Sequence, residues 1–351
     1  MGGKGGSGGG GGSGSRGSGG GGGGGGGYMK APGGGGAYVS RDAFESDPKA
    51  YFMIICPWNP ENASKRADSA TYRLDVMFGL IGKVTVVTGG ARGIGAATAK
   101  LFAKNGAHVV IADILDDLGA DLAESIGGRY IHCDVSKEQD VESAIELALS
   151  WKGHLDIMFS NAGISGIEGS ITTIDMEQVK RLLSINLHGT IHGIKHAARA
   201  MIESKNGGSI ICTSSSAATM GGLASHSYTI SKAGMLGLMR SAACELGVHL
   251  IRVNCISPHG VPSEMLLSAY RRFGIEDIKP EDVTEMVGKR ASLLQGRGAT
   301  LEDVAQAALF LASEDSGFIT GHELVVDGGY TSANSAMSYI YRHKEDGIGN
   351  N

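Results

Sequence analysis

Short apolar segments alternate with segments of helical periodicity from residue 80 to residue 331. The apolar segments, such as Val84–Thr88 and His108–Ala112, are only a few residues long and rich in Val and Ile. Strands that are apolar on both faces are typical of a parallel sheet covered by helices on both sides. The sequence therefore predicts one doubly wound α/β domain with a seven-stranded parallel sheet. The predicted strands are 84–88, 108–112, 130–133, 155–160, 209–213, 251–256 and 323–326, and the predicted helices are 94–103, 116–126, 138–151, 175–204, 228–247 and 301–312.

A glycine-rich turn, Thr88-Gly-Gly-Ala-Arg-Gly-Ile-Gly95, joins the first predicted strand to the first predicted helix. Its first glycine permits a tight turn, and the later ones let the backbone approach a pyrophosphate at the helix N-terminus. A glycine-rich loop alone is weak evidence in a chain with 58 glycines, but the strand before it and the helix after it strengthen the interpretation. The turn therefore predicts a dinucleotide site of the Rossmann type. The residues predicted to bind are Gly89, Arg92, Gly93, Ile94 and Gly95.

Asp113 follows the second predicted strand. A carboxylate at this position accepts hydrogen bonds from the adenosine ribose hydroxyls and repels a 2′-phosphate. The sequence therefore predicts NAD as the cofactor. Arg92 lies in the glycine-rich turn and could bind a 2′-phosphate, so NADP is kept as the alternative.

Tyr228 and Lys232 stand four residues apart at the start of the predicted helix 228–247, and residues four apart project from one face of a helix. A positive charge beside a phenol favours the phenolate. The sequence therefore predicts a pKa of Tyr228 below its ordinary value of about 10, and a role as proton acceptor. This spacing also occurs by chance on many helices, so the interpretation depends on the dinucleotide turn upstream.

Three serines, Ser214 to Ser216, lie between the predicted strand 209–213 and this helix. One of their hydroxyls could hydrogen-bond the same substrate oxygen as Tyr228. Strand alternation places Ser215 on the opposite face from Ser214 and Ser216. Ser215 is therefore the predicted site serine, and its two neighbours are the alternatives.

Seven motifs occur in an order that resembles the short-chain dehydrogenase/reductase family, over residues 80–331. They are Thr88-Gly-x-x-x-Gly-Ile-Gly95, Cys133-Asp-Val135, Asn161-Ala-Gly163, Asn186, Ser215, Tyr228-x-x-x-Lys232 and Asp327-Gly-Gly329. Within the family, the segments Asn254–Gly260 and Asp327–Thr331 resemble the plant alcohol dehydrogenases of specialised metabolism, a group that includes borneol dehydrogenase. The resemblance implies a Rossmann-type oxidoreductase.

This resemblance also implies roles for further residues. Asp134 and Val135 would hold the adenine, and Asn186 would anchor a water that passes protons from Lys232 to solvent. His259 interrupts a Pro-Gly pair that is common in the family, which leaves the cofactor contact of that segment open. The other residues expected to bind the cofactor are Asn161, Ala162, Gly163, Tyr228, Lys232, Pro258, Gly260 and Val261.

The expected reaction is the oxidation of a secondary alcohol to a ketone. Tyr228 takes the hydroxyl proton as a phenolate, Lys232 lowers the pKa of that phenol, and Ser215 hydrogen-bonds the reacting oxygen. The resemblance implies that NAD accepts the hydride and that no metal takes part. An NADPH-preferring ketone reductase and a non-catalytic nucleotide-binding sensor are the alternatives.

The segment 259–300 is long and poorly periodic, and it is predicted to form a lid over the site. Its apolar residues suit a small alicyclic or terpenoid alcohol better than a sugar, an acid or a phosphorylated compound. The family resemblance implies a monoterpenoid such as borneol. Arg271 and Arg272 are expected to face solvent. The predicted substrate residues are Ser215, Tyr228, Ile164, Met220, Leu223 and Met265, with further apolar bulk from Ile167, Val261, Leu266, Leu267, Tyr270, Phe273 and Ile275.

The segments outside the α/β domain differ from it in composition. Glycine fills 24 of the first 36 positions without apolar periodicity, so residues 1–36 are predicted to be disordered. Residues 37–79 form an atypical extension that is expected to be poorly ordered, and its apolar run Tyr51–Cys56 is too short to span a membrane. The domain at 80–331 is followed by a tail at 332–351.

Charge and cysteine spacing restrict the partners. A formal net charge of −5 argues against a nucleic-acid partner. The five cysteines show no C-x-x-C pair and no zinc spacing with His, so no metal site is predicted and free thiols in the cytoplasm are expected. The family resemblance implies a homotetramer that packs through helices 175–204 and 228–247. The small residues expected in that contact are Ala233, Gly234, Gly237, Ala242 and Ala243.

Overall fold

The computed structural model describes residues 28–30, 38–40 and 79–333. The chain divides into two units, residues 1–73 and residues 74–351. In the first unit, β1 (Tyr28–Lys30) pairs antiparallel with β2 (Tyr38–Ser40). Most of the predicted tract 1–36 and extension 37–79 lies outside the described residues, as does the predicted tail from residue 334 onward.

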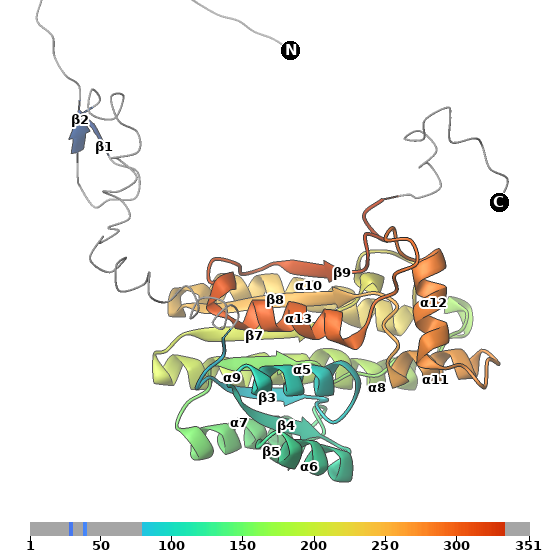
Figure 1. Cartoon of the computed structure of the whole chain (residues 1–351), viewed down its shortest axis with the longest axis horizontal. Coiled ribbons are helices and arrows are strands. Elements are labelled where there is room, and N and C mark those ends of the chain that lie inside the picture. The colour runs from blue at the N-terminus through green and yellow to red at the C-terminus, as the bar shows by residue number, and fades with distance from the viewer. Residues whose placement is uncertain (1–27, 31–37, 41–78, 334–351) are drawn as a thin grey trace, which may run out of the picture. The chain divides into compact units, whose positions relative to one another are not determined.

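The second unit contains a parallel sheet of seven strands in the order β5-β4-β3-β6-β7-β8-β9 (Figure 1). This confirms the predicted doubly wound, seven-stranded Rossmann-type fold. All residues of β3 and β6 are buried, as expected for strands that are covered on both faces. The strands are β3 (Val84–Thr88), β4 (His108–Asp113), β5 (Arg129–His132), β6 (Ile157–Ser160), β7 (Gly208–Thr213), β8 (Ile251–Pro258) and β9 (Glu323–Val326).

The strand order reverses at β3. The chain runs from β3 through β4 to β5, returns to the other side of β3 with β6, and continues through β7 and β8 to β9. In open α/β sheets, ligands bind in the crevice at the carboxyl ends of the strands where the order reverses. Gly89 and Asn161 directly follow β3 and β6, so this topology brings two of the predicted cofactor motifs together.

Helices cover both faces of the sheet. α5 (Gly93–Lys104), α6 (Asp116–Ser125) and α13 (Leu301–Ala312) pack on one face, and α7 (Glu138–Lys152), α9 (Gly189–Ser204) and α10 (His226–Leu246) pack on the other. On the first face, the rings of Phe102 and Phe159 lie with their centroids 6.5 Å apart. Burying one such side chain stabilises the fold by about 1.5–3 kcal/mol, so apolar packing holds both helical layers on the sheet.

The segment predicted as one helix over 175–204 is interrupted. It forms α8 (Met176–Leu183), a π-helical turn (Ser184–His188) and α9. Asp175 begins α8, because its side chain accepts a hydrogen bond of 2.9 Å from the Glu177 N–H. The π-helical turn carries the buried Asn186, whose side chain bonds to another segment of the chain rather than to its own helix. π-Helical turns of this kind are frequent at functional sites.

The lid segment 259–300 folds into two short helices, α11 (Glu264–Arg272) and α12 (Pro280–Arg290). Figure 1 shows them together beyond one end of the sheet. They enclose a small core of their own, formed by Leu267, Ile278, Val283 and Val287. Each helix buries only a few side chains, which explains the poor apolar period of this segment.

Candidate active site

A cavity of about 1040 Å³ lies at the carboxyl ends of the strands and extends beneath the lid. Of the predicted site residues, Gly95, Asn186 and Met220 do not line it. The predicted residues that line it are Gly89, Arg92, Gly93, Ile94, Asp113, Asp134, Val135, Asn161, Ala162, Gly163, Ile164, Ser215, Leu223, Tyr228, Lys232, Pro258, Gly260, Val261 and Met265. The fold thus brings motifs from six strand ends into one cavity.

The glycine-rich turn packs closely against the residues around it. Gly89 and Gly93 have φ angles of +61° and +58°, which favour glycine. A Cβ atom on Gly95 would lie 2.0 Å from the Gly89 carbonyl oxygen. Arg92 occupies the N-cap of α5 without a side-chain hydrogen bond to the first turn. This leaves backbone N–H groups of the helix N-terminus for an anionic ligand, so the turn fits a dinucleotide pyrophosphate.

Asp113 is buried at the end of β4, and its carboxylate is held by the backbone. It accepts hydrogen bonds from the Ala91 N–H at 2.9 Å and the Leu115 N–H at 3.1 Å. Each carboxylate oxygen has a second lone pair, so Asp113 can still accept from a ribose hydroxyl in the cavity. Ile114 also lines the cavity although its side chain is exposed. Ile114 was not predicted from the sequence, where its position directly after Asp113 is the only signal for it.

Asn161 connects three strand ends. Its side-chain amide donates to the carbonyl oxygens of Thr88 and Gly89 at 3.1 and 3.2 Å, and its Oδ1 accepts from the Thr213 hydroxyl at 3.1 Å. These bonds fix the ends of β3, β6 and β7 relative to one another. The floor of the cavity is therefore preorganised by side chain–backbone hydrogen bonds.

Asn186 is fully buried behind Gly163 and Ile164. Its Oδ1 accepts from the Ile164 N–H at 2.8 Å, and its Nδ2 donates to the Ile164 carbonyl at 3.0 Å and to Ser231 Oγ at 3.2 Å. Its side chain thus holds the loop that follows β6 against α10.

Tyr228 and Lys232 lie on the first turns of α10, whose N-cap residue is Ser225. The Lys232 Nζ lies 5.5 Å from the centre of the Tyr228 ring and donates a hydrogen bond of 2.6 Å to the Thr213 carbonyl. The spacing read from the sequence therefore places both side chains at the cavity, with the ammonium over the face of the phenol.

The three serines have different partners. Ser215 Oγ hydrogen-bonds Tyr228, whereas Ser214 Oγ donates to the Lys232 carbonyl at 3.1 Å and Ser216 Oγ bonds His259 Nδ1 at 2.9 Å. All three serines line the cavity, but only Ser215 also bonds the phenol of Tyr228. The geometry therefore favours Ser215 over its two neighbours.

The electrostatics of Tyr228 differ from the sequence prediction. Burial raises the pKa of Tyr228, and the hydrogen bond from Ser215 opposes this rise. Burial also lowers the pKa of Lys232 to about 8. The predicted lowering of the Tyr228 pKa is therefore wrong for this structure, because burial of the phenol outweighs the charge of Lys232.

The lid forms the apolar wall of the cavity. Met220 was predicted as a substrate residue opposite the lid but does not line the cavity, because a turn at Ser216–Ala218 redirects the chain before it. Ile167, Leu267 and Ile275 do not line it either. Met286, Val287 and Tyr330 also line the cavity but were not predicted, and His259, whose contact was left open, lines it too. The predicted lid residues that line it are Val261, Met265, Leu266, Tyr270 and Phe273.

Arg272 joins the lid to the loop after β6. Its Nη2 donates to Ser165 Oγ at 3.1 Å, to the Gly166 carbonyl at 3.3 Å and to Glu168 Oε1 at 3.3 Å. Arg272 is exposed and does not line the cavity, as expected, but its guanidinium also holds the lid to this loop. Arg271 instead pairs within its own helix, with Glu264 at 2.6 Å.

Arg272→Ala is expected to loosen the lid, because three hydrogen bonds between α11 and the loop are lost. We expect amide hydrogen exchange in residues 264–272 to become about tenfold faster, since local opening costs less free energy. Hydrogen exchange read by mass spectrometry measures this. Arg271→Ala is the matched control, and equal acceleration in both variants would contradict a specific role of Arg272.

In the described residues, no group of three or more His, Cys, Asp and Glu side chains is placed to hold a metal ion. None of the helices in that part of the chain is long and apolar enough to cross a membrane.

Comparisons with known proteins agree with this geometry. A family model described as Enoyl-(Acyl carrier protein) reductase matches residues 89–331, and a second, described as Egg apparatus-1 protein, matches residues 18–65. The Short-chain dehydrogenase reductase ATA1 of Arabidopsis thaliana is 62% identical over 264 residues, covering 75% of this chain and 97% of that protein. The (+)-borneol dehydrogenase 2 of Salvia officinalis is 44% identical over 263 residues, covering 74% and 92%. A short-chain type dehydrogenase/reductase from Mycobacterium marinum superposes with a TM-score of 0.65 at 31% identity, covering 73% of this chain and 98% of that one.

Proposed function

Because the chain belongs to the short-chain dehydrogenase/reductase family of oxidoreductases, we propose that it oxidises a hydrophobic secondary alcohol to a ketone with NAD. The observation that carries this proposal is the contact of Ser215 with Tyr228 above Lys232, at the floor of a cavity with an apolar lid. In this arrangement the phenol can transfer one proton to or from a substrate oxygen, while the hydroxyl hydrogen-bonds that oxygen and the ammonium lies close by.

In the proposed reaction, the Tyr228 phenolate takes the proton from the alcohol oxygen. Ser215 donates a hydrogen bond to the same oxygen and stabilises the negative charge that develops there. Lys232 keeps a positive charge near the phenolate as long as it is protonated, and Asn186 holds the loop at Gly163 and Ile164 beside it. When bound, the nicotinamide cofactor accepts the hydride that leaves the carbinol carbon.

The residues present fit a nicotinamide dinucleotide. The N-terminus of α5 would hold the pyrophosphate, and Asp134 and Val135 would contact the adenine at the end of β5. Asn161, Ala162 and Gly163 would cover the middle of the cofactor. The nicotinamide end would lie against Pro258, Gly260 and Val261, all of which line the cavity.

NAD is proposed over NADP because the buried carboxylate of Asp113 would repel a 2′-phosphate. Asp113→Ser is expected to lower the ratio of kcat/KM for NAD to kcat/KM for NADP by about tenfold to a hundredfold, with Arg92 then free to bind the phosphate. Initial rates with both cofactors on one alcohol measure this ratio. Asp121→Ser removes an exposed carboxylate from α6 and should leave the ratio unchanged. A wild-type preference for NADP would contradict the assignment of Asp113.

The substrate class is proposed from the apolar wall formed by Met265, Leu266, Tyr270, Phe273 and Met286. A monoterpenoid such as borneol fits this chemistry, and a borneol dehydrogenase is among the relatives. The test is a panel of monoterpenoid and other alicyclic alcohols with NAD, followed by the absorbance of the reduced nicotinamide. Turnover of hydrophobic secondary alcohols is expected, and no turnover of any of them would refute the proposal.

Two alternatives give different results in the same assays. An NADPH-preferring ketone reductase would reduce the corresponding ketones with NADPH faster than with NADH. A non-catalytic nucleotide-binding sensor would bind NAD, and its Tyr228→Phe variant would behave like the wild type in every assay. The complete set of Ser215, Tyr228 and Lys232 supports an enzyme, because a sensor needs no proton acceptor.

We further propose a homotetramer in the cytoplasm. Ala233, Gly234 and Gly237 form an exposed stripe of small residues on α10 that supports close packing against a second copy. Ala242 and Ala243 were expected in this contact, but both are buried within the chain. The free thiols of the described cysteines support a reducing compartment. Light scattering should give a mass of four chains.

A further inference from the structure

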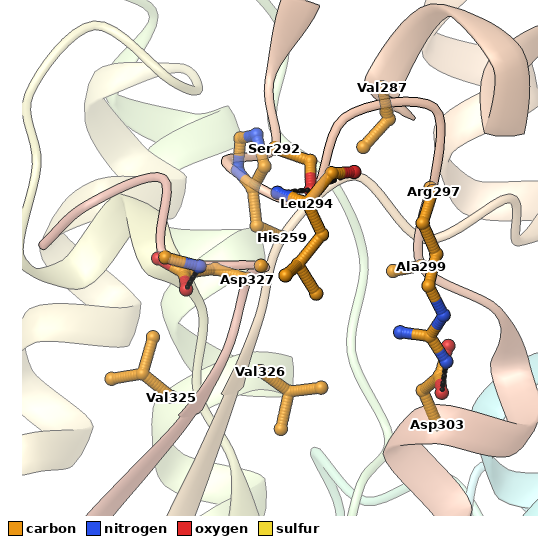
Figure 2. Close-up of a pocket in the computed structure, with 13 residues that line it drawn as sticks. His259, Val287, Ser292, Leu294, Arg297, Ala299, Asp303, Val325, Val326 and Asp327 are labelled. Carbon is orange, nitrogen blue, oxygen red and sulfur yellow. Dashed lines mark hydrogen bonds and ion pairs between the residues drawn. The ribbon is translucent and has the colours of Figure 1, made fainter. Parts of the chain in front are cut away.

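A second cavity of about 250 Å³ lies beside the main one, between the ends of β8 and β9 and the segment that leads into α13 (Figure 2). Figure 2 shows His259 on one side of it and the ion pair of Arg297 with Asp303 on the other. His259 and Val287 line both cavities. His259 therefore stands in the wall between the small cavity and the proposed catalytic cavity.

His259 connects three strand ends. Its N–H donates to the Val326 carbonyl at 3.1 Å, at the end of β9. Its Nδ1 bonds Ser216 Oγ at 2.9 Å, just after β7. Its ring stacks on Tyr330 with centroids 4.5 Å apart and planes 15° apart. The His259 side chain is thus held at one ring face by Tyr330 and at one ring nitrogen by Ser216.

Tyr330 is itself held in place by a tight turn. The Asp327 carboxylate accepts hydrogen bonds from the Gly329 N–H at 2.7 Å and from the Thr331 N–H at 2.8 Å. The Tyr330 N–H donates to the Asp327 carbonyl at 3.2 Å. The stacking partner of His259 is therefore part of an ordered turn and provides a firm support for the imidazole.

Ser216 transmits this support to the neighbouring serine. It is 2% exposed, so no bulk water can replace the imidazole as its partner. It lies in the short turn Ser216–Ala218, in which the Ala217 N–H donates to Ser215 Oγ at 3.2 Å and the Ala218 N–H donates to the Ser215 carbonyl at 2.9 Å. A shift of Ser216 must therefore move Ser215, whose hydroxyl bonds Tyr228.

We propose that His259 is a positioning residue that orients Ser215 against Tyr228 through its hydrogen bond to Ser216. This inference rests on the proposed function, in which Ser215 and Tyr228 share the reacting oxygen. The imidazole acts through the serine turn and contacts no reacting atom. Its stacking on Tyr330 sets the direction from which Nδ1 meets Ser216.

A double-mutant cycle on the full chain tests this role. His259→Phe keeps the stacked ring but removes the ring nitrogen, and Ser216→Ala removes the hydroxyl. Each single variant is expected to lower kcat on the best alcohol of the panel by about tenfold, and the double variant also by about tenfold rather than a hundredfold. The KM for the alcohol and the Kd for NAD should stay within about twofold, since only the reacting oxygen loses a partner. Ser216→Thr restores the hydroxyl and should recover most of the rate.

Ser209→Ala is the matched control, because it also removes a buried serine hydroxyl, from the other end of β7, where Oγ donates to the Leu311 carbonyl at 2.8 Å. It should lower the melting temperature as much as Ser216→Ala does and leave kcat within about twofold. A hundredfold loss of kcat in the double variant, the product of the two single losses, would overturn the proposal. A Ser216→Ala variant with a lower melting temperature but an unchanged kcat would also overturn it. If His259→Phe does not fold, the comparison of Ser216→Ala with Ser216→Thr decides.

A second measurement needs no alcohol. The hydrogen bond from Ser215 favours the phenolate of Tyr228, which faces Lys232 as its charged neighbour. Ultraviolet titration of the phenol, taken as the difference from Tyr228→Phe, should therefore show a higher pKa in Ser216→Ala and in His259→Phe than in the wild type. If the pKa of the Tyr228 phenol is the same in both variants as in the wild type, the positioning role is refuted, even if the protein oxidises alcohols. If the pKa of the phenol is higher in both variants but the protein oxidises no alcohol, the proposed reaction is refuted and the positioning role is still supported.

Discussion

Tyr228→Phe is expected to lower kcat for alcohol oxidation by about a thousandfold, because the phenol is the proposed acceptor of the substrate proton and general-base contributions reach about 10²–10⁴. The Kd for NAD should change little, since the ring and Lys232 remain in place. Steady-state kinetics and cofactor titration measure the two effects separately. Tyr270→Phe removes a phenol hydroxyl from the lid of the same cavity, and its kcat should fall by no more than about threefold.

The pH dependence of the wild type gives a second measure of the same assignment. Burial raises the pKa of Tyr228, so the phenolate fraction is small at neutral pH and grows as the pH rises. The rate of oxidation should therefore increase from about pH 7 to about pH 9. Ketone reduction requires the protonated phenol, which predominates throughout this range, so its rate should change little. An oxidation rate independent of pH in this interval would contradict Tyr228 as the base.

Gly95→Ala is expected to abolish cofactor binding, with at least a hundredfold rise in the Kd for NAD, or about 2.7 kcal/mol. The new Cβ would lie 2.0 Å from the Gly89 carbonyl oxygen and 2.9 Å from Asn161 Nδ2. Both neighbours belong to the floor of the cavity, so the glycine-rich turn must move away from Asn161. Fluorescence titration with NADH measures the affinity, and circular dichroism verifies that the sheet is still formed.

Gly247→Ala is the matched control for this substitution. A Cβ at position 247 meets nothing within 4 Å, and the residue has an ordinary helical φ of −59°. The variant should keep the affinity of the wild type. If Gly95→Ala binds NAD with the affinity of the wild type, the turn must accept a Cβ atom at a position where the structure shows a clash. This result would remove the physical basis of the dinucleotide assignment.

The sequence predicts the sheet well because each strand carries its own local signal. Val84–Thr88 and His108–Asp113 are apolar on both faces, and the glycine-rich turn and Asp113 have fixed positions after such strands. The parallel topology then brings these strand ends together without further information. This explains why most of the predicted cofactor residues line one cavity.

The sequence predicts less where long-range contacts decide. The partners of Arg272 lie more than a hundred residues away, so no local pattern distinguishes it from Arg271. The pKa of Tyr228 depends on burial by the whole domain, which outweighs the neighbour four residues further along the helix. The role of His259 emerges only when the ends of β7, β8 and β9 are seen side by side.

The lid keeps its own core, formed by Leu267, Ile278, Val283 and Val287, apart from the two cores that hold the sheet. We expect a change of side-chain volume in this core to be absorbed by α11 and α12, while Ser215 after β7 and Tyr228 on α10 stay where they are. The lid, which is proposed to select the substrate, can thus change in sequence while the proposed catalytic residues keep their positions. For an engineer, residues 264–290 are the segment to randomise when a different alcohol is wanted, with the catalytic floor left as it is.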